Sequence, residues 1–511
     1  MIPALADYAR SINILLATAG EGQSVYLVGG AVRDLLLGQP LHDLDFTSSP
    51  PIKPLARALA DNLDAALFLL DEERETYRII EKPGDERRLT YDLARLRGAD
   101  LHTDLLDRDF TINAIAIDLS APAALIDPLG GAQDLQAHLL RPCSQQAFIN
   151  DPVRVLRAVR LCVHFQLRME PPTIHSLQAA IPGLQRVSLE RQRDELLKML
   201  SGPRPSTAIR LLDRLGIVES VLPELAGMKG VQQSAPHQLD VWEHTLAVLQ
   251  ALEEVLTTLA EPFSEGKTAS LWLGMASQRL GRYRPQLTTY IQEELVSERS
   301  RRGLLFLGAI LHDCAKPAVQ QVEDDGKIHF YQHEKVGQDT TRKVARRLKL
   351  SEDEVEFLTR LVGDHMRIHH LARAAGPLSR RSIYRFFQSA GSAGPGLVVL
   401  SLADTLATYG VTLTEATWQA ELESARQLLE AWYEAPEVAV APPRILTGDD
   451  IIQSLGVSPG PIVGQLLAII REKQACGEVQ SREQALSLAQ ELMRQGLSAE
   501  GENHGSSIET S

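Results

Sequence analysis

The stretch Tyr26–Phe46, YLVGGAVRDLLLGQPLHDLDF, restricts the fold of this chain more than any other segment. An apolar run from Val25 to Val28 leads into two glycines, then a short amphipathic segment, and then two aspartates separated by one apolar residue. This order predicts a strand, a turn, a helix and a second strand. Gly29 and Gly30 allow a bend with positive φ and leave no side chain between the turn and a phosphate. The free N–H groups at the start of the helix would favour an anion at the same place.

The two aspartates of this stretch are candidate metal ligands. Side chains alternate along a strand, so Asp43 and Asp45 would share one face while Leu44 and Phe46 point into the core. Two carboxylates so placed are hard oxygen ligands for Mg²⁺ ions that also hold the phosphates of a nucleotide. A D-x-D pair alone is more often the solvated end of a strand, because two acidic residues on a strand are common. The D-x-D pair indicates a nucleotide-binding site because it follows the G-G pair after one short helical segment.

This combination resembles the signature of the nucleotidyltransferase superfamily. The sequence GGAVRD resembles the motif of one branch of this superfamily. That branch comprises the class II tRNA nucleotidyltransferases (CCA-adding enzymes) and the bacterial poly(A) polymerases. The resemblance implies that Asp43 and Asp45 are catalytic and hold two Mg²⁺ ions, that Gly30 lets the nucleotide approach, and that Arg33 binds phosphate or ribose. It also implies a polymerase-β-like α/β head with a mixed sheet.

A second motif of the head lies in Asp104–Asp118, DLLDRDFTINAIAID. Arg108 offers a donor fork suited to phosphate, Asp109 an acceptor suited to a ribose hydroxyl, and Asn113 an amide that can hold both of them. A salt-bridged entry to a strand would explain the same residues without a ligand. The segment resembles the second motif of the family, R-R-D-F-T-x-N-A, which implies nucleotide binding by Arg108 and Asp109. Asp107 stands where the first arginine of that motif is normally found.

A third motif, NDPVRVLRAVR, begins at Asn150. Arg154, Arg157 and Arg160 recur every three residues and would lie along one side of a helix, which suits a clamp for a triphosphate but also fits an exposed amphipathic helix. The stretch resembles the family's E-D-x-x-R motif followed by L-R-x-x-R. This resemblance implies that Asp151 and Arg154 select C or A by hydrogen bonding to the base, and that Arg157 and Arg160 bind phosphate or ribose. Asn150 replaces the usual glutamate.

The region after this motif is predicted to contact RNA. Between Asp151 and Arg214 there are eleven Arg or Lys residues against six acidic ones, although the whole chain has a formal charge of −14. The overall charge argues against a protein that coats nucleic acid indiscriminately, whereas the local excess predicts an RNA contact that weakens with salt. Within this region, Ser188–Leu200 resembles the helical neck motif of the family, in which Glu190 and Arg191 are expected to be structural.

A second constellation, rich in histidine and aspartate, begins near residue 240. His244, the adjacent pair His312 and Asp313, and Asp404 lie in apolar, helical surroundings. A lone histidine in a helix is more often a core residue, but imidazole and carboxylate groups from separate helices suit a divalent transition metal that activates water. The pattern resembles the HD superfamily of metal-dependent phosphohydrolases, which implies a metal site at these four residues. Further groups of this kind follow the pair: His333, Glu334 and His365.

Length and composition predict several globular domains in a reducing compartment. The chain of 511 residues exceeds what one core accommodates. It has no run close to the roughly 18 apolar residues of a membrane helix, and Asp7 and Arg10 interrupt the apolar pattern of the N-terminus, so a secretion signal is not predicted. The four cysteines are widely separated and predict neither a zinc cluster nor a disulfide framework. We therefore expect a cytoplasmic protein without membrane association.

The expected fold class is multidomain α+β. The predicted parts are a nucleotidyltransferase head with an α/β mixed sheet over 1–145, an all-α neck for base recognition and RNA binding over 146–230, an HD domain over 231–415, a helical tail over 416–500 and a disordered end over 501–511. An insertion is expected over Glu261–Ser300. The head strands are expected at Val25–Val28, Leu44–Thr47, Ala66–Leu70, Tyr77–Ile80, Arg88–Leu93 and Ala114–Leu119.

The predicted function is Mg²⁺-dependent transfer of C and/or A residues from CTP and ATP to the 3′ end of tRNA, with pyrophosphate as leaving group. Some members of the resembled family also carry an HD domain that hydrolyses 2′,3′-cyclic phosphates or 2′-phosphates, so phosphoester hydrolysis with a divalent transition metal is a second expectation. Its metal and substrate do not follow from the spacing.

Three alternatives stay open at this stage. The enzyme could add only CC or only A, and the segment Leu70–Leu105 resembles the compact form of some A-adding members. A poly(A) polymerase is a second alternative, although the long basic C-terminus expected of it is absent. In the third, an inactive RNA-binding head serves an HD phosphohydrolase, which the retention of Asp43 and Asp45 disfavours. The sequence does not decide the oligomeric state or the effects of Asp107 and Asn150.

Overall fold

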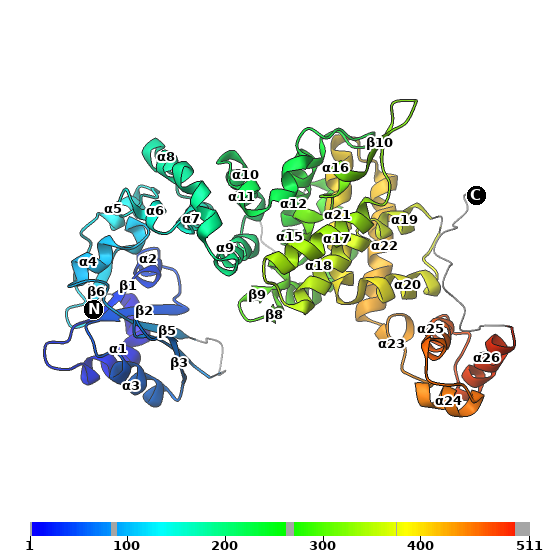
Figure 1. Ribbon diagram of the computed structural model, residues 1–511, viewed down its shortest axis with the longest axis horizontal. Coiled ribbons are helices and arrows are strands. Elements are labelled where there is room, and N and C mark those ends of the chain that lie inside the picture. The colour runs from blue at the N-terminus through cyan, green and yellow to red at the C-terminus, as the bar shows by residue number, and fades with distance from the viewer. Residues whose placement is uncertain (1–2, 83–88, 262–269, 375, 496–511) are drawn as a thin grey trace. The chain divides into compact units, whose positions relative to one another are not determined.

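The computed structural model describes residues 3–82, 89–261, 270–374 and 376–495. The chain divides into two compact units, Met1–Leu196 with Thr207–Val221, and Leu197–Ser206 with Leu222–Ser511. The first contains a large sheet and the second is almost entirely helical (Figure 1). The predicted multidomain α+β class is therefore confirmed. The predicted disordered end at 501–511 lies outside the described residues.

The first unit is built on a mixed seven-stranded sheet with the order β3-β4-β5-β2-β1-β6-β7 (Figure 1). β2 lies near its centre, antiparallel to β1 and parallel to β5. Each predicted strand is present within a few residues, and Arg88, the expected start of the fifth, lies outside the described residues. The strands are β1 (Val25–Val28), β2 (Asp43–Ser48), β3 (Ala66–Asp71), β4 (Thr76–Ile80), β5 (Thr90–Arg95), β6 (Ala116–Asp118) and β7 (Leu125–Ile126).

The alternation of side chains along β2 separates the core from the candidate site. Leu44 and Phe46 are buried in the head core, while Asp43 is exposed and Asp45 half-buried. That core is completed by the helices α1 (Ala9–Thr18), α2 (Gly30–Leu36) and α3 (Lys53–Leu63). Burial of each large aliphatic or aromatic side chain contributes about 1.5–3 kcal/mol, so a shift of β2 by one residue would be strongly disfavoured. The core thereby fixes the face on which the two aspartates lie.

Helices follow the sheet through the rest of the first unit. They carry the second and third motifs and the predicted neck. Their bounds are α4 (Leu101–Leu106), α5 (Gly131–Gln136), α6 (Ala147–Asn150), α7 (Arg154–Phe165), α8 (Pro171–Ala180), α9 (Leu189–Ser201), α10 (Pro205–Arg214) and α11 (Val218–Val221).

The second unit is a bundle of helices around α12 (Val241–Leu259) and α21 (Gly394–Tyr409), which pack against each other. Among the described residues, one helical stretch, Arg380–Thr412, is long and apolar enough to cross a membrane, and 78% of its apolar window is buried inside the protein. That burial is what a core helix shows. The surrounding helices are α15 (Arg301–Leu311), α16 (Lys316–Val319), α17 (His333–Arg347), α18 (Glu352–Asp364), α19 (Arg367–Arg373) and α20 (Arg380–Ala390).

The interval predicted as an insertion is folded where the structure describes it. It contains the helices α13 (Leu271–Leu280) and α14 (Arg284–Gln292) and the short strands β8 (Glu294–Val296) and β9 (Arg299–Ser300), while 262–269 lie outside the described residues. A second small hairpin, β10 (Gln320–Val322) and β11 (Ile328–Phe330), precedes α17.

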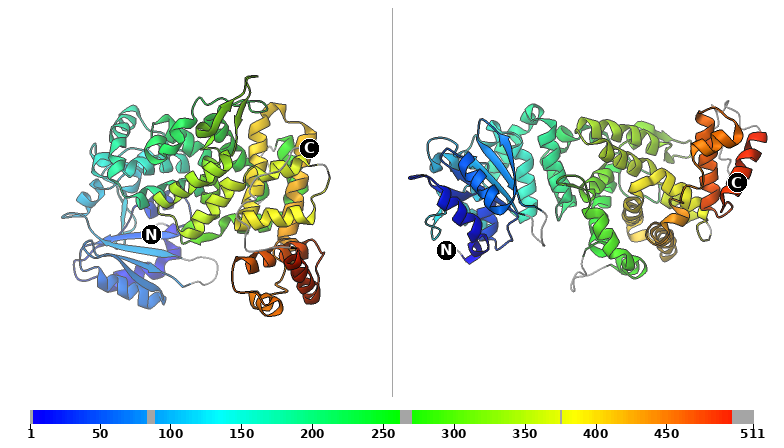
Figure 2. Two further views of the ribbon diagram at one scale, coloured as in Figure 1. Left: turned by 45° about the vertical axis from the view of Figure 1, so that its right-hand side comes forward. Right: turned by 90° about the horizontal axis from the view of Figure 1, so that it is seen from below.

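The helix that begins at the predicted start of the tail belongs to the bundle. In α22 (Glu415–Tyr433), Trp418 is fully buried and donates a hydrogen bond to the carbonyl of Trp272 at 2.9 Å. After α23 (Pro436–Ala439), a separate apolar core starts at Leu446. It joins α24 (Gly448–Leu455), α25 (Pro461–Ala475) and α26 (Arg482–Arg494), which form a distinct group in Figures 1 and 2.

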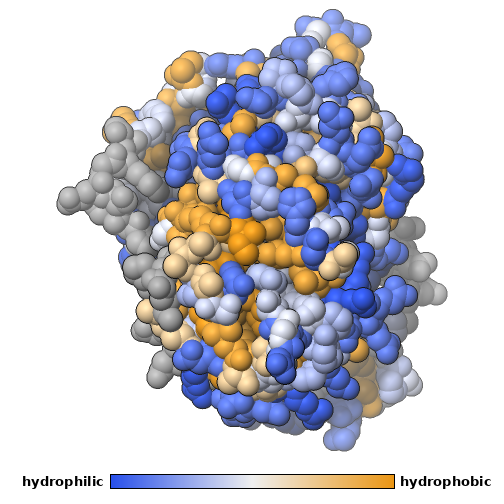
Figure 3. Space-filling view, turned by 90° about the vertical axis from the view of Figure 1, so that its left-hand side faces the viewer, coloured by the Kyte–Doolittle hydropathy of each residue, from blue (hydrophilic) through white to orange (hydrophobic). Residues whose placement is uncertain are grey.

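Three consecutive apolar side chains are exposed on the edge strand of the first unit. Phe68, Leu69 and Leu70 of β3 are each about half exposed. Figure 3, which looks onto the left-hand side of Figure 1, shows hydrophobic side chains gathered near the middle of that face, with hydrophilic ones around them.

Candidate functional site

The G-G turn brings the two motifs of the head into contact. Gly29 has φ 72° and links β1 to the start of α2. A Cβ atom at this position would lie 3.0 Å from Nη1 of Arg108 and 3.4 Å from Oδ2 of Asp45. A side chain at Gly30 would meet Nη2 of Arg33 at 3.3 Å. The glycines are thus needed both for the bend and for the close approach of a carboxylate and two arginines.

A third carboxylate, which the sequence analysis missed, lies beside the predicted pair. Asp92 of β5 is opposite Asp45 of β2 in the parallel register. Both oxygens of Asp92 accept hydrogen bonds from Arg78, each at 2.9 Å. Burial, then Asp92 and Asp43, raise the pKa of Asp45 to about 6, and Arg108 and Arg33 offset only part of this rise. Closely spaced carboxylates that resist ionisation together fit a divalent cation, which would relieve their repulsion.

The predicted phosphate-binding arginines are held in place by their neighbours. Nη1 of Arg33 donates to Asn113 at 2.5 Å, and its guanidinium carbon lies 4.3 Å from the ring centre of Phe165. Arg108 donates twice to Oδ2 of Asp104, at 3.0 and 2.9 Å, and Asp104 is 1% exposed. Fixed guanidinium groups lose little entropy when they bind an anion, so this arrangement suits phosphate recognition.

One acid of the neck helix organises the arginines of α7. Glu195 accepts from Nε of Arg157 at 3.0 Å and from Nε of Arg160 at 2.7 Å. Nη1 of Arg157 also donates to Asp109 at 3.2 Å. Burial acts to raise the pKa of Glu195, but Arg160 and Arg157 outweigh it and hold that pKa below its usual value. The sequence analysis did not single out Glu195, because its role depends on how α9 packs against α7.

The predicted base-reading pair is not joined by a direct contact among the described residues. Asp151 accepts a hydrogen bond from Nη2 of Arg191 at 2.7 Å. Arg154 donates to the backbone carbonyls of Asp107 at 2.9 Å, Arg108 at 3.2 Å and Ala147 at 3.3 Å. Arg154 therefore ties the third motif to the second. Asp107, which stands where the family motif has its first arginine, takes part in this link through its backbone carbonyl group.

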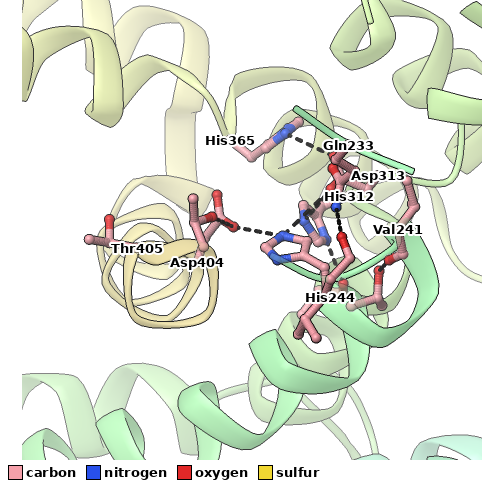
Figure 4. A network of polar contacts seen from close by, with 12 residues as sticks. Gln233, Val241, His244, His312, Asp313, His365, Asp404 and Thr405 are labelled. Carbon is pink, nitrogen blue, oxygen red and sulfur yellow. Dashed lines mark hydrogen bonds and ion pairs between the residues drawn. The ribbon is translucent and has the colours of Figure 1, made fainter. Parts of the chain in front are cut away.

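The four predicted HD residues converge in the second unit (Figure 4). Nε2 of His244 lies 3.0 Å from Oδ1 of Asp404 and 3.7 Å from Oδ2 of Asp313. Nε2 of His312 lies 3.1 Å from the same Asp313 oxygen. Figure 4 shows His244 between Asp404 on one side and the His312–Asp313 pair on the other, on separate helices. The first three are 1% exposed and Asp404 is 8% exposed.

The donor set of this centre fits a cation. Nε2 of His244, Nε2 of His312 and Oδ2 of Asp313 are buried and form no hydrogen bond of regular geometry in the described structure, although buried polar atoms are normally satisfied. Their near neighbours are ion-pair partners: Asp404 for His244, Asp313 for His312, and Lys316 for Asp313. Nδ1 of His312 is 2.8 Å from the carbonyl of Ala309, so Nδ1 carries the hydrogen and, in the neutral ring, Nε2 presents its lone pair. This is the arrangement of metal-binding histidines. Imidazole nitrogen with carboxylate oxygen suits a divalent transition metal.

Several groups around the centre were not identified as ligands from the sequence. Nζ of Lys316 lies 2.7 Å from Oδ2 of Asp313. His369 is held between Asp404 at 2.9 Å and Glu421 at 2.7 Å. Burial acts to lower the pKa of His369, but its bonds to Asp404 and Glu421 outweigh it and raise that pKa to about 10. The spacing of Lys316 from Asp313 was a usable signal, whereas nothing local connects Glu421 to His369.

A pocket of about 630 Å³ opens beside this centre. Asp313, Asp404, His333 and His365 line it. The pKa of His365 is lowered to about 3 by burial, with His312 and His333 adding to the effect, so its ring is neutral. Three cationic side chains also line the pocket: Lys316, Lys327 and Arg373. A cluster of candidate metal ligands in a pocket lined by cationic side chains is suited to an anionic substrate.

Three family models match the chain. The Poly A polymerase head domain matches residues 25–141, the probable RNA and SrmB-binding site of polymerase A matches residues 166–228, and the HD domain matches residues 241–409. Their order agrees with the expected head, RNA-binding neck and HD domain.

Relatives match over nearly the full length. The A-adding tRNA nucleotidyltransferase of Deinococcus radiodurans is 33% identical over 91% of this chain and 94% of its own. The CC-adding tRNA nucleotidyltransferase of Thermus thermophilus is 31% identical over 91% of this chain and 92% of its own. A solved CCA-adding enzyme in complex with ATP has the same fold, with a TM-score of 0.57, 20% identity, and coverage of 95% of this chain and 96% of its own.

Proposed function

This chain belongs to the tRNA nucleotidyltransferase family, and we propose that its head transfers C and/or A residues from CTP and ATP to the 3′ end of tRNA with Asp43 and Asp45 holding Mg²⁺. The observation that carries this proposal is the meeting of three elements at one place. The carboxylates of β2, the G-G turn at the start of α2 and Arg108 of the second motif converge there. Such a site combines metal ligands with donors for a triphosphate.

The side chains of the head divide the work of the reaction. Bound Mg²⁺ would lower the pKa of the attacking 3′-hydroxyl and neutralise the leaving pyrophosphate. Gly30 leaves room for the phosphates, which Arg33 and Arg108 bind through guanidinium groups already held by Asn113 and Asp104. Because these groups are fixed before the nucleotide arrives, little reorganisation is needed in the transition state.

The α7 residues extend the site toward the ribose and the base. Arg157, anchored by Asp109 and Glu195, and Arg160 bind phosphate or ribose in this proposal. Asp151 and Arg154 read the base. Their place at the start of α7 supports this role, because Arg154 reaches the backbone of Arg108.

Which nucleotides are added is decided by product analysis. The purified protein is incubated with tRNA transcripts that lack the whole CCA end, the last two nucleotides or only the terminal A, each with labelled CTP or ATP, and products are resolved at nucleotide resolution. We expect addition that stops after C or A residues of the CCA end. Long tails with ATP alone would instead identify a poly(A) polymerase. An Asp45→Ala variant that keeps substantial transfer would overturn the assignment of the metal ligands.

Phosphoester hydrolysis by the HD domain is a second candidate function. Its support is the buried cluster of His244, His312, Asp313 and Asp404 beside a pocket lined by cationic side chains. The test supplies 2′,3′-cyclic nucleotides with nickel, manganese or magnesium. Hydrolysis that disappears in His312→Gln, while nucleotide addition by the head persists, would support a separate site. Hydrolysis unchanged by this substitution would rule the cluster out.

The cysteines and the local charge support a cellular location and a binding partner. All four cysteines are free thiols, which supports a reducing cytoplasm as its location. The excess of positive charge between Asp151 and Arg214 supports tRNA binding by the neck.

A further inference from the structure

The guanidinium group of Arg33 is held from several sides at the start of α2. Its Nε and Nη2 atoms lie 2.9 and 2.8 Å from Oδ1 of Asp34, and its Nη1 atom donates to Asn113 at 2.5 Å. A Cβ atom at Gly30 would lie 3.3 Å from Nη2 and 3.8 Å from both Cζ and Nη1. The ring of Phe165 packs against the same group, with its centre 4.3 Å from Cζ. Arg33 is thus oriented by α2, by the second motif and by α7.

Phe165 acts on the charge of Arg33 and not on one of its hydrogen bonds. Cζ lies over the ring, and the electron-rich face of an aromatic ring attracts a cation. The Arg33 side chain is 11% exposed, and such an attraction is stronger where water is largely excluded. The contacts with Asp34 and Asn113 occupy donors of Arg33. Each Nη atom nevertheless carries a second N–H group, from which a phosphate or ribose oxygen can accept a hydrogen bond.

The helix that carries Phe165 is also fastened to the head at its other end. Arg154, the first residue of α7, donates to the carbonyl of Arg108 at 3.2 Å. One turn later, Nη1 of Arg157 donates to Asp109 at 3.2 Å. The 12 residues of α7 span about 18 Å, and Phe165 is the last of them. The position of the aromatic ring is therefore set by the same helix that carries Arg154 and Arg157.

We propose that Phe165 is a positioning residue for nucleotide binding. Its ring holds Arg33 in the orientation that binds the nucleotide, and α7 thereby joins this contact to the end of the helix where Asp151 and Arg154 read the base. The inference rests on the proposed function of the head, in which Arg33 binds phosphate or ribose. Phe165 acts through Arg33, so its replacement weakens the binding of nucleotide and leaves the reacting groups in place.

Nucleotide binding by Phe165 variants tests this role. The Kd of the full chain for CTP and for ATP is measured by equilibrium dialysis with Mg²⁺, and circular dichroism checks the folding of each variant. Phe165→Leu keeps an apolar side chain but removes the aromatic face, so Kd should rise about tenfold. The rise should be equal for each nucleotide that the parent binds, because CTP and ATP have the same ribose and triphosphate. Phe165→Tyr keeps the ring and should bind like the parent.

Steady-state kinetics provide a second measurement of the same variants. Phe165→Leu should raise KM and leave kcat nearly unchanged, the pattern of an interaction that is equally strong in the ground state and the transition state. Phe68→Leu makes the same change at a half-exposed position on the edge strand β3. It is the matched control and should bind and react like the parent.

A double-mutant cycle separates the positioning of Arg33 from a general effect on the fold. In an Arg33→Met background, Phe165→Leu should leave Kd unchanged, because the cation that the ring holds is absent. An equal rise in Kd with and without Arg33, or an unchanged Kd in Phe165→Leu, would overturn the role of Phe165 while the function of the head stands. A parent that binds neither CTP nor ATP would overturn the proposed function of the head, and this inference with it.

Discussion

Asp92 of β5 lies opposite Asp45 of β2 in the parallel pairing of the two strands, and its carboxylate accepts hydrogen bonds from Nε and Nη2 of Arg78. This pairing places a third negative charge beside the two candidate Mg²⁺ ligands. Burial, and after it the charge of Asp92, raise the pKa of Asp45. The carboxylate that shapes the electrostatics of the site thus comes from a strand that the metal motif does not contain.

Replacing Asp92 should impair catalysis without unfolding the head. Asp92→Asn keeps the size of the side chain but removes the charge beside Asp45, and loss of a group that orients a metal ligand typically costs about 10- to 100-fold in activity or metal affinity. Nucleotide incorporation at limiting Mg²⁺ measures the effect. Asp71→Asn on the edge strand β3 is the control and should leave incorporation unchanged. Unimpaired Asp92→Asn would show that Asp43 and Asp45 suffice.

Gly29 should be intolerant of a methyl group for two separable reasons. Gly29→Ala strains a backbone with φ 72° and pushes against Arg108 and Asp45, so a loss of about 100-fold in kcat/KM is expected from misplaced reacting groups. Gly38 also has positive φ, at 67°, but nothing lies within 4 Å of a Cβ there. Gly38→Ala should therefore lower the melting temperature while retaining catalysis. Equal catalytic losses in the two variants would contradict the steric argument.

Glu195 should stabilise the first unit above its titration range. Its pKa in the folded protein is below the unfolded value of 4.5 because Arg160 and Arg157 outweigh burial. The ionised group therefore contributes stability above pH 4.5, and this contribution is lost as the pH falls below 4.5 through the folded pKa. Glu195→Gln should cost about 2 kcal/mol at pH 7. Thermal unfolding at a series of pH values should show the parent and the variant converging in acid.

The same substitution should weaken nucleotide binding. Without Glu195, Arg157 and Arg160 lose their shared anchor, so KM should rise for CTP and ATP alike. Asp194→Asn, on the same helix α9 and with a side chain 47% exposed, is the matched control for both measurements. A pH-independent difference between Glu195→Gln and the parent would argue against the ion pairs.

Asp151 should affect the choice of nucleotide more than the overall rate. Asp151→Asn converts one acceptor into a donor, so the ratio of kcat/KM for CTP to that for ATP should change by about tenfold or more, the effect of one mismatched buried hydrogen bond. As a control, Gln145→Ala, at an exposed position before the motif, should leave this ratio unchanged. Equal losses for both nucleotides in Asp151→Asn would instead assign Asp151 to holding Arg191.

Much of the head could be predicted because its signals are local. The period-2 pattern of β2 placed Leu44 and Phe46 in the core and Asp43 and Asp45 on the other face, as the structure shows. The four HD positions also converge as predicted. The contacts of Arg154 could not be predicted in this way. Its guanidinium group donates to three backbone carbonyls, and a pattern of side chains does not indicate such contacts.

The sequence by itself determined which segments become strands and helices, which face of β2 is polar, and where the two groups of candidate metal ligands lie along the chain. Those properties depend on residues close together along the chain. Only the tertiary structure decided that Asp92 lies beside Asp45, that Glu195 joins two arginines, and that Asp313 faces His333 and His365 as well as His312. Strand register and helix packing follow from the burial of apolar side chains that are far apart in the sequence. A local sequence pattern therefore does not predict which polar groups this burial brings together.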